Sequence, residues 1–277
     1  MSSCKESRSK SAWVQEWAHV VAHDGQGDVY KLTLRAPEIA RRAVAGQFVE
    51  VRCTPGRATA LDPLLRRPFS LCEIRPEEGE ITLIYRVVGR GTKLLSAVAP
   101  GSELDVMGPL GHSFPDPAVG EGRLVLVGGG LGIPPMVAAA ERAVRVGREA
   151  AAVIGARSQV YLAGRTELDG INLPTKVMTD DGSAGEKGFV TQPLRQMIAA
   201  GEVGEVWACG PEGMLQAVKE LCLPAGVRCF VSVERHMACG FGACIGCTVP
   251  KAGQPGFFKA CQDGPVFAAE EVELGGA

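Results

Sequence analysis

Four cysteines near the C-terminal end restrict what this chain can fold into. Cys239, Cys244, Cys247 and Cys261 lie within 23 residues and have the spacing C-x4-C-x2-C-x13-C. The first three match the spacing of plant-type [2Fe–2S] centres, in which each iron takes two thiolates and two bridging sulfides. A tight loop then wraps one side of the cluster, and a distant residue closes the other. We therefore predict that these four thiolates hold a [2Fe–2S] cluster.

Small residues fill the same loop. Gly240, Gly242, Ala243 and Gly246 let backbone N–H groups approach the sulfides and stabilise an added electron. The alternative is a zinc ribbon, but that fold prefers two C-x2-C pairs, and here Cys261 stands alone. The other six of the ten cysteines are scattered, which fits a reducing compartment where thiols rarely pair.

Charge and hydropathy exclude other classes of protein. A formal net charge of −2 over 277 residues argues against a nucleic-acid binder, which usually shows a basic stripe. The longest uncharged run, residues 124–140, contains four glycines and two prolines and is too short to span a membrane. The N-terminus shows no secretion signal. We expect a cytoplasmic protein whose partners include neither nucleic acid nor membrane.

Periodicity divides the chain into three folded parts after a tail. Residues 1–11 are polar and aperiodic, and we predict that they are disordered. Residues 12–114 read as a small antiparallel β-barrel, residues 115–232 as a parallel α/β domain with helices on both faces, and residues 233–277 as a small cysteine-rich domain. The last domain has little periodicity, so we expect it to be held by something other than a hydrophobic core.

Particular segments carry these assignments. In the barrel, alternation predicts strands at residues 29–35, 47–52 and 80–87, with one helix at residues 93–98. In the α/β domain, short apolar strands are predicted at residues 124–127, 151–154, 176–178 and 206–208, and helices at residues 135–146, 191–199 and 211–221.

Two turns of the α/β domain are candidate nucleotide-binding segments. Gly128, Gly130 and Gly132 follow an apolar strand and open a helix, where a pyrophosphate can reach backbone N–H groups. The match to G-x-G-x-x-G is incomplete because Ile133 replaces the third glycine, and a tight connection is the alternative. Cys209 begins a C-G-P turn that should face the same crevice. The alternative is that Cys209 is simply a small buried residue with no part in nucleotide binding.

The barrel contains a possible flavin or phosphate site. An arginine, an aromatic residue and a hydroxyl residue stand together in Arg67-Pro68-Phe69-Ser70, and Tyr85-Arg86-Val87 and Gly91-Thr92 follow. Such sets are common, and solvated surface charges are the alternative for Arg67 and Arg86.

Together these motifs resemble the ferredoxin–NADP reductase superfamily. The R-x-F-S segment at Arg67 looks like its flavin motif, the run GLGIPP that begins at Gly130 like its nicotinamide loop, and the turn at Cys209 like its C-G-P turn. The ordered series LLRRPFS, YRVVGRGT, LDVMGPLG, VGGGLGIPP, CGPEGML, MACGFGACIGC and KACQDGPVF is more closely similar to the electron-transfer subunits of B-type dihydroorotate dehydrogenases. It spans nearly the whole chain after the tail.

The resemblance implies an FAD-binding barrel, an NAD-binding α/β domain and a domain holding one [2Fe–2S] cluster. It implies that the cluster ligands are the four cysteines above, that Cys209 is catalytic, and that Gly128, Gly130 and Gly132 bind the nucleotide. The residues it implies for FAD are Arg67, Pro68, Phe69, Ser70, Tyr85, Arg86, Val87, Gly91 and Thr92. The segment Ala156-Arg157-Ser158 leaves NADP open as the alternative to NAD.

The same resemblance implies the activity. It describes an oxidoreductase subunit that passes electrons from the FMN of a dihydroorotate dehydrogenase catalytic subunit, through [2Fe–2S] and FAD, to NAD+ in pyrimidine biosynthesis, in a heterotetramer. We find no obvious base for dihydroorotate, so this chain alone should not oxidise it. One alternative is an NAD(P)H:ferredoxin-type reductase subunit of a bifurcating or sulfide-oxidising complex. Another is a non-enzymatic iron–sulfur sensor, against which the intact flavin and nicotinamide motifs argue.

Overall fold

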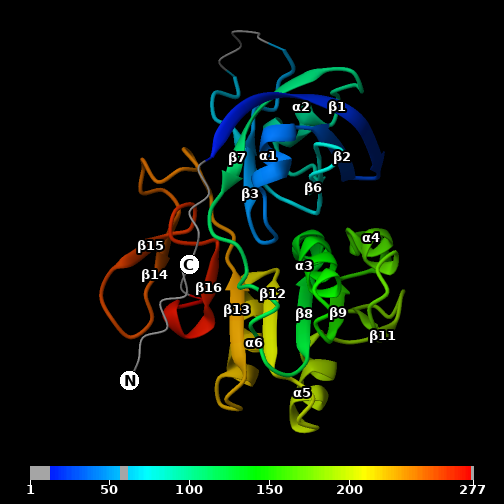
Figure 1. The fold of residues 1–277 in the computed structure, drawn as a ribbon, viewed down its shortest axis with the longest axis vertical. Coiled ribbons are helices and arrows are strands. Elements are labelled where there is room, and N and C mark those ends of the chain that lie inside the picture. Colours follow the sequence, from blue (N-terminus) through cyan, green and yellow to red (C-terminus); the bar gives the residue numbers. More distant parts are fainter. Residues whose placement is uncertain (1–12, 57–61, 276–277) are drawn as a thin grey trace.

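Two seven-stranded sheets form the body of the molecule, one above the other in Figure 1, and a C-terminal module lies beside both. The structure is a computed structural model that describes residues 13–56 and 62–275. The predicted tail, residues 1–11, lies outside the described residues.

The upper sheet is antiparallel throughout and has the strand order β4-β3-β7-β1-β2-β6-β5. Alternating residues such as Leu32, Leu34 and Leu83 are fully buried, and they make the inside of this half-barrel. Its elements are β1 (Val14–Gln26), β2 (Val29–Arg35), α1 (Pro37–Arg42), β3 (Phe48–Val51), β4 (Arg67–Ser70), β5 (Glu73–Arg75), β6 (Glu80–Arg86), α2 (Arg90–Leu95) and β7 (Glu103–Leu110).

The lower sheet has the order β11-β10-β9-β8-β12-β13-β16 and is parallel except for β16. Its central strands are buried on both faces, which explains their continuous apolar runs. Its strands are β8 (Leu124–Gly129), β9 (Ala150–Ala156), β10 (Thr175–Thr179), β11 (Glu186–Lys187), β12 (Glu205–Cys209), β13 (Arg228–Ser232) and β16 (Val266–Ala268).

Helices cover both faces of this sheet. On one face, α3 (Ile133–Arg145) and α4 (Arg165–Asp169) contribute Ile133, Met136 and Leu168 to one apolar core. On the other face, α5 (Thr191–Ala199) and α6 (Glu212–Cys222) contribute to a second core. The crossover connections therefore place helices where the alternating pattern predicts them.

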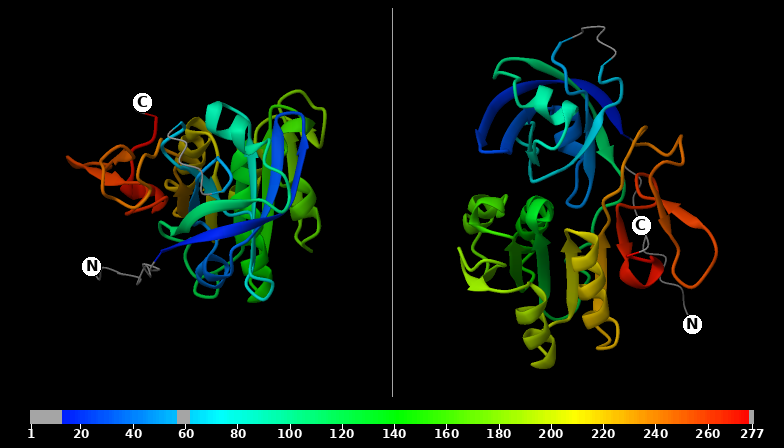
Figure 2. Two further views of the ribbon diagram at one scale, coloured as in Figure 1. Left: turned by 90° about the horizontal axis from the view of Figure 1, so that it is seen from above. Right: turned by 180° about the vertical axis from the view of Figure 1, so that it is seen from behind.

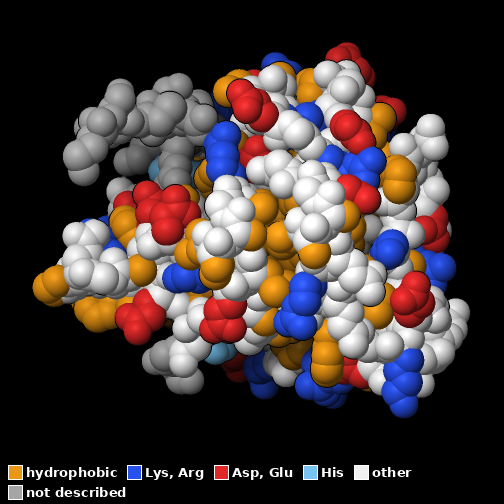
Figure 3. Space-filling model, turned by 90° about the horizontal axis from the view of Figure 1, so that it is seen from below, with side chains coloured by type: hydrophobic (Ala, Val, Ile, Leu, Met, Phe, Trp, Pro, Cys, Tyr) orange, Lys and Arg blue, Asp and Glu red, His pale blue; other side chains and the backbone are white. Residues whose placement is uncertain are grey.

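The C-terminal module does not stand apart from the lower sheet. It contains the hairpin of β14 (Thr248–Pro250) and β15 (Phe257–Lys259), which projects away from the body (Figure 2), and apolar side chains lie at its end in Figure 3. Strand β16 pairs with β13, and Phe267 and Val272 are fully buried in the core that also contains Val231. The expectation that this module lacks a hydrophobic core is therefore wrong, because its apolar side chains pack onto the neighbouring domain.

The predicted architecture of an antiparallel barrel, a parallel α/β domain and a small C-terminal module is confirmed, while the domain boundaries stay predictions. The helix predicted at residues 93–98 begins earlier, at Arg90, because the Thr92 hydroxyl accepts the backbone N–H groups of Val88 and Gly89. Within the part of the chain that the structure describes, no helix is long and apolar enough to cross a membrane.

Candidate functional site

A cleft of about 270 Å³ lies between the two sheets and takes its walls from both. The barrel contributes β4, β6 and the start of α2. The α/β domain contributes Leu131 and the segment that follows β13. Seven of the nine residues predicted to contact FAD line this cleft: Arg67, Pro68, Phe69, Ser70, Tyr85, Arg86 and Thr92. The structure therefore brings together motifs that are distant in the sequence, and their roles toward FAD stay predictions.

The remaining two predicted FAD residues, Gly91 and Val87, do not line the cleft. A Cβ atom at Gly91 would lie 3.0 Å from Nε of Arg67, so this glycine lets the arginine side chain pass closely over α2. Val87 is not among the lining residues, whereas its neighbour Val88 is.

The guanidinium of Arg67 is available to an anion. Its Nη1 donates to the backbone oxygens of Leu65 and Arg66, at 2.9 and 3.0 Å, and it forms no ion pair with a carboxylate in the described part of the chain. A guanidinium held in this way can still offer N–H groups to a phosphate. Arg86 differs, because it lies 3.4 Å from a carboxylate oxygen of Asp28 and over the ring of Tyr161.

An aromatic cluster makes the apolar wall of the cleft. Tyr85 is stacked on Tyr30 and meets the edge of Phe69, with ring centroids 5.7 and 5.4 Å apart. The Tyr85 hydroxyl lies 2.9 Å from Nε2 of His23, and burial raises the pKa of Tyr85. Tyr85 therefore stays protonated and offers a flat, uncharged surface of the kind that a planar ring system packs against.

The glycine loop and the C-G-P turn meet at the carboxyl ends of two adjacent parallel strands. Gly128 on β8 is paired with Cys209 on β12. Gly132 approaches so closely that an added Cβ atom would collide with the backbone of Cys209, and Gly130 has a φ of +55°. The chain then enters α3 at Ile133. This arrangement leaves backbone N–H groups open at the end of the sheet where nucleotides bind in such folds.

Cys209 itself does not line the cleft. Its side chain is 1% exposed, and burial raises the pKa of its thiol, which bonds to Ser232. The thiol is therefore uncharged at neutral pH, and the catalytic role of Cys209 stays a prediction. Sequence reasoning missed Ser232 and Glu234, which do line the cleft. Their signal was their position at the carboxyl end of β13, where Ser232 is the last residue of the strand and is paired with Cys209, and Glu234 follows two residues later.

The four clustered cysteines approach each other as two pairs. Sγ of Cys247 lies 3.2 Å from Sγ of Cys261, and both residues are buried. Sγ of Cys239 accepts the backbone N–H of Cys244 at 3.4 Å, and both of these residues are partly exposed. Two pairs of thiols suit a cluster in which each iron takes two thiolates.

Backbone N–H groups point at the sulfurs. Burial alone would raise the pKa of Cys239, but N–H groups of Cys244, Phe241 and Ala243 lower it to about 7. The N–H of Gly242 likewise bonds to Cys261. Thiolate ligands surrounded by such donors fit a [2Fe–2S] cluster, whose sulfurs accept the same kind of hydrogen bond.

Known proteins share these features. The profile of the "Iron-sulfur cluster binding domain of dihydroorotate dehydrogenase B" matches residues 234–273, and that of the "Oxidoreductase NAD-binding domain" matches residues 126–220. The chain is 41% identical to the dihydroorotate dehydrogenase B (NAD(+)) electron transfer subunit of Geobacillus thermodenitrificans, over 88% of this chain and 93% of that protein. It is 40% identical to the corresponding subunit of Geobacillus sp. strain WCH70, over 94% and 99% of the two chains.

Solved structures agree with these sequence relationships. The structure of an NADH-dependent reduced ferredoxin-NADP oxidoreductase, a flavin-based bifurcating enzyme, superposes with a TM-score of 0.80 and 32% identity, covering 93% of this chain and 90% of that chain. Phthalate dioxygenase reductase shares the fold, with a TM-score of 0.56 and 19% identity over 76% of this chain and 64% of that one.

Proposed function

This chain belongs to the family of electron transfer subunits of dihydroorotate dehydrogenase B (NAD(+)), and we propose that it receives its electrons from an FMN-containing catalytic subunit within a heterotetramer. It is an oxidoreductase subunit whose cofactors are FAD and a [2Fe–2S] cluster and whose nucleotide is NAD. When bound, the cluster carries single electrons, the nicotinamide accepts a hydride, and the flavin can exchange electrons in either way.

One observation carries this function: a single segment contributes to both cofactor sites. Ser232, Glu234 and Met237 line the cleft, and Cys239 follows only two residues after Met237. The cluster thiols and the flavin cleft are therefore neighbours in space as well as in sequence, as electron transfer between them requires.

The residues of the chain divide the work of binding. We assign the phosphates of FAD to Arg67, and the flat wall of its site to Phe69 and Tyr85. The loop from Gly128 to Gly132 presents backbone N–H groups to the pyrophosphate of NAD. None of these residues is a base placed for dihydroorotate, which the partner subunit must oxidise.

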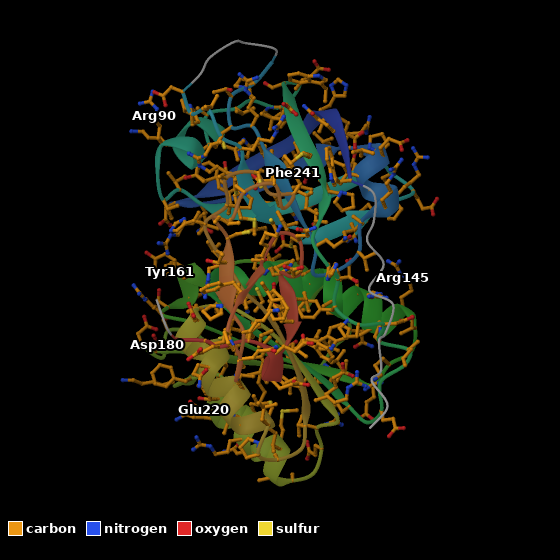
Figure 4. The ribbon with its side chains drawn as sticks, turned by 90° about the vertical axis from the view of Figure 1, so that its left-hand side faces the viewer. Arg90, Arg145, Tyr161, Asp180, Glu220 and Phe241 are labelled. Atoms are coloured by element: carbon orange, nitrogen blue, oxygen red, sulfur yellow. The ribbon has the colours of Figure 1, made fainter. Side chains whose placement is uncertain are left out.

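The partner docks on the cluster loop in this proposal. Phe241 and Ile245 lie on that loop and are 43% and 79% exposed, and the ring of Phe241 packs against the exposed Trp13 at 5.7 Å. Figure 4 shows Phe241 on the side of the molecule that faces the viewer. An exposed apolar group beside redox-active thiols is typical of an interface, because electrons must cross there over a short distance.

Two variants test the assembly. Phe241→Asp should prevent co-purification of the catalytic subunit while NADH still reduces the bound FAD. Phe257→Asp is the matched control, because Phe257 is 64% exposed in the same module but lies on the β14–β15 hairpin. Unchanged co-purification of the partner with Phe241→Asp would contradict docking at this loop. The native mass of the complex tests the heterotetramer.

The variant Cys244→Ser tests whether electrons pass through the cluster between FAD and the partner subunit. The variant should lose iron and acid-labile sulfide, keep FAD, and still accept a hydride from NADH, but it should no longer pass electrons between FAD and the partner. Cys53→Ser is the control, since Cys53 is a buried barrel cysteine outside the loop. If FAD were lost together with iron, the two sites would not be separable as proposed.

A second candidate rests on the solved NADH-dependent ferredoxin-NADP oxidoreductase, which matches 93% of this chain. In this alternative the partner would be a subunit of a bifurcating or sulfide-oxidising complex. Mass spectrometry of the co-purified partner decides between the two, since a dihydroorotate-oxidising flavoprotein supports the first and any other flavoprotein supports the second.

A further inference from the structure

Five charged side chains form a continuous row of ion pairs across the boundary between the barrel and the α/β domain. Arg75 on β5 is paired in two ways with Glu141 on α3, with both N···O distances at 2.8 Å. Arg75 also bonds to Glu73 at 2.8 Å, and Glu73 lies 3.1 Å from Nζ of Lys31 on β2. Lys31 completes the row through Glu167 on α4 at 2.8 Å. We call these five residues the ion chain.

The ion chain crosses the boundary at both of its ends. Lys31, Glu73 and Arg75 belong to the barrel, whereas Glu141 and Glu167 belong to two different helices on one face of the lower sheet. The signs alternate along the row, so each inner member has an opposite charge on both sides. Such a network stabilises more than separate surface pairs do, because each charge is held by two partners.

The surroundings strengthen these pairs. The side chains of Glu73, Glu141 and Glu167 are only 12–19% exposed. Burial would lower the pKa of Lys31, but hydrogen bonds to Glu167 and Glu73 outweigh it and raise that pKa. Beneath the row, the buried Cys72 and the partly buried Ile74 of the barrel pack into the core that contains Ile133 and Met136 of α3. The ion chain therefore borders an apolar contact between the two domains.

The position of Glu141 connects the ion chain to the nucleotide loop. Glu141 lies on the same helix as Ile133, the first residue of α3, and η1 (Gly130–Gly132) with the glycine loop directly precedes it. A helix transmits displacement as a rigid rod over the roughly 12 Å between these two residues. On the barrel side, β5 pairs with β6, whose residues Ile84 to Arg86 line the cleft. The ion chain thus joins a strand next to the flavin wall to the helix that begins at the nucleotide loop.

We propose that the ion chain positions α3 and its glycine loop against the flavin-binding strands, and so determines how well the nicotinamide meets the flavin. This inference rests on the proposed function, because it takes FAD to lie in the cleft. Its members are positioning residues that contact neither cofactor. Small errors in the placement of reacting groups reduce transfer rates strongly.

The test uses the full chain with FAD and cluster bound, and the variants Glu141→Gln, Arg75→Met and their combination. The rate of FAD reduction at saturating NADH should fall about tenfold in each single variant, with FAD content unchanged. The combination should be no slower than the slower single variant, because one interaction is removed in all three. Raising the salt concentration should slow the parent protein towards the variants and leave the variants nearly unaffected.

Glu80→Gln is the matched control. It breaks the pair of Arg35 and Glu80, at 3.1 Å, which lies within the barrel and does not cross the boundary. Its rate should equal that of the parent. The proposal would be overturned if Glu141→Gln reduced FAD as fast as the parent, or if Glu80→Gln lost as much of this rate as Glu141→Gln does. Additive losses of rate in the combined variant would overturn it as well.

A second measurement does not depend on activity. Amide hydrogen exchange in α3 and β5, measured without NADH, should become faster in Glu141→Gln and Arg75→Met and stay unchanged in Glu80→Gln. Unchanged exchange in all three would count against the ion chain as a link between the domains. If the parent protein failed to oxidise NADH, the proposed function would be wrong, whereas the exchange measurement would still decide whether the ion chain holds α3 against β5.

Discussion

Gly240 of the cluster loop lies directly against the side chain of Glu50. A Cβ atom at Gly240 would be 2.5 Å from Cγ of Glu50, and the glycine has a φ of +74°. Glu50 is fully buried on β3, where it is paired with Pro68 of the flavin motif on β4. The loop that carries Cys239 is therefore seated on β3, the strand that pairs with β4 and its flavin-wall residue Phe69.

This contact predicts that Gly240→Ala lowers the iron content of the purified protein while FAD stays bound. The added methyl group both strains the backbone and displaces the loop from Glu50. Gly253→Ala is the control, because Gly253 has a φ of +67° but no atom within 4 Å of an added Cβ atom. The control should keep its iron. Adding Glu50→Ala to Gly240→Ala should restore part of the iron, and no recovery would show that strain alone causes the loss.

A second prediction concerns retention of the flavin. Arg67→Ala should weaken FAD binding about tenfold or more, since a charge-assisted hydrogen bond to phosphate typically contributes about 1.5–3 kcal/mol. Arg90→Ala removes another arginine nearby, one whose ion pair with Asp62 is exposed, and it should have little effect. The FAD remaining after dialysis, measured by its absorbance, checks both variants. Equal retention by the two would mean that Arg67 is only a surface charge.

The structure also shows which parts of the site local sequence can predict. The four cysteines are a short motif whose chemistry depends on neighbouring residues, so their spacing alone predicts a cluster site. The R-x-F-S segment is too common a pattern to predict a flavin site by itself, and its role follows only from the resemblance to a family. Glu234 and Met237 were missed because they face the cleft only after β13 has joined the lower sheet, and β13 was not predicted. The ion chain joins Lys31 to Glu167, 136 residues apart, and no local pattern marks such a pair.

Glu234 gives a prediction for pH dependence. Desolvation by the atoms that line the cleft raises the pKa of the Glu234 carboxyl above its usual 4.5, although part of the residue is exposed to solvent. Above the raised pKa its negative charge favours the cationic nicotinamide of NAD+ over neutral NADH, and this preference is lost as the pH falls through that pKa. Glu234→Gln should remove this pH dependence of NAD+ binding. Glu220→Gln, on the exposed part of α6 (Figure 4), should retain it.

The same shift has a consequence for stability. Because the folded protein holds the Glu234 proton more tightly than the unfolded chain does, the contribution to stability is greatest below pH 4.5 and is lost as the pH rises through the raised pKa. Glu234→Gln should therefore have a slightly higher melting temperature than the parent at pH 8, the effect being small because Glu234 is partly exposed to solvent, and the difference should shrink as the pH falls to 4.5. A constant difference at every pH would contradict the raised pKa.

The last prediction concerns the nucleotide loop. Gly132 has no room for a side chain, because an added Cβ atom would collide with the carbonyl group of Cys209, and a backbone neighbour cannot turn away as a flexible side chain could. Gly132→Ala should separate the ends of β8 and β12 and weaken NADH binding at least tenfold, with FAD and iron retained in full. Gly213→Ala is the control: Gly213 lies on α6 near the same turn, and nothing stands within 4 Å of its added methyl group. Titration of each variant with NADH under anaerobic conditions, followed by flavin absorbance, measures both affinities. Tight binding by Gly132→Ala would mean that the nucleotide does not depend on this loop, and weak binding by both variants would place the cause in α6 instead.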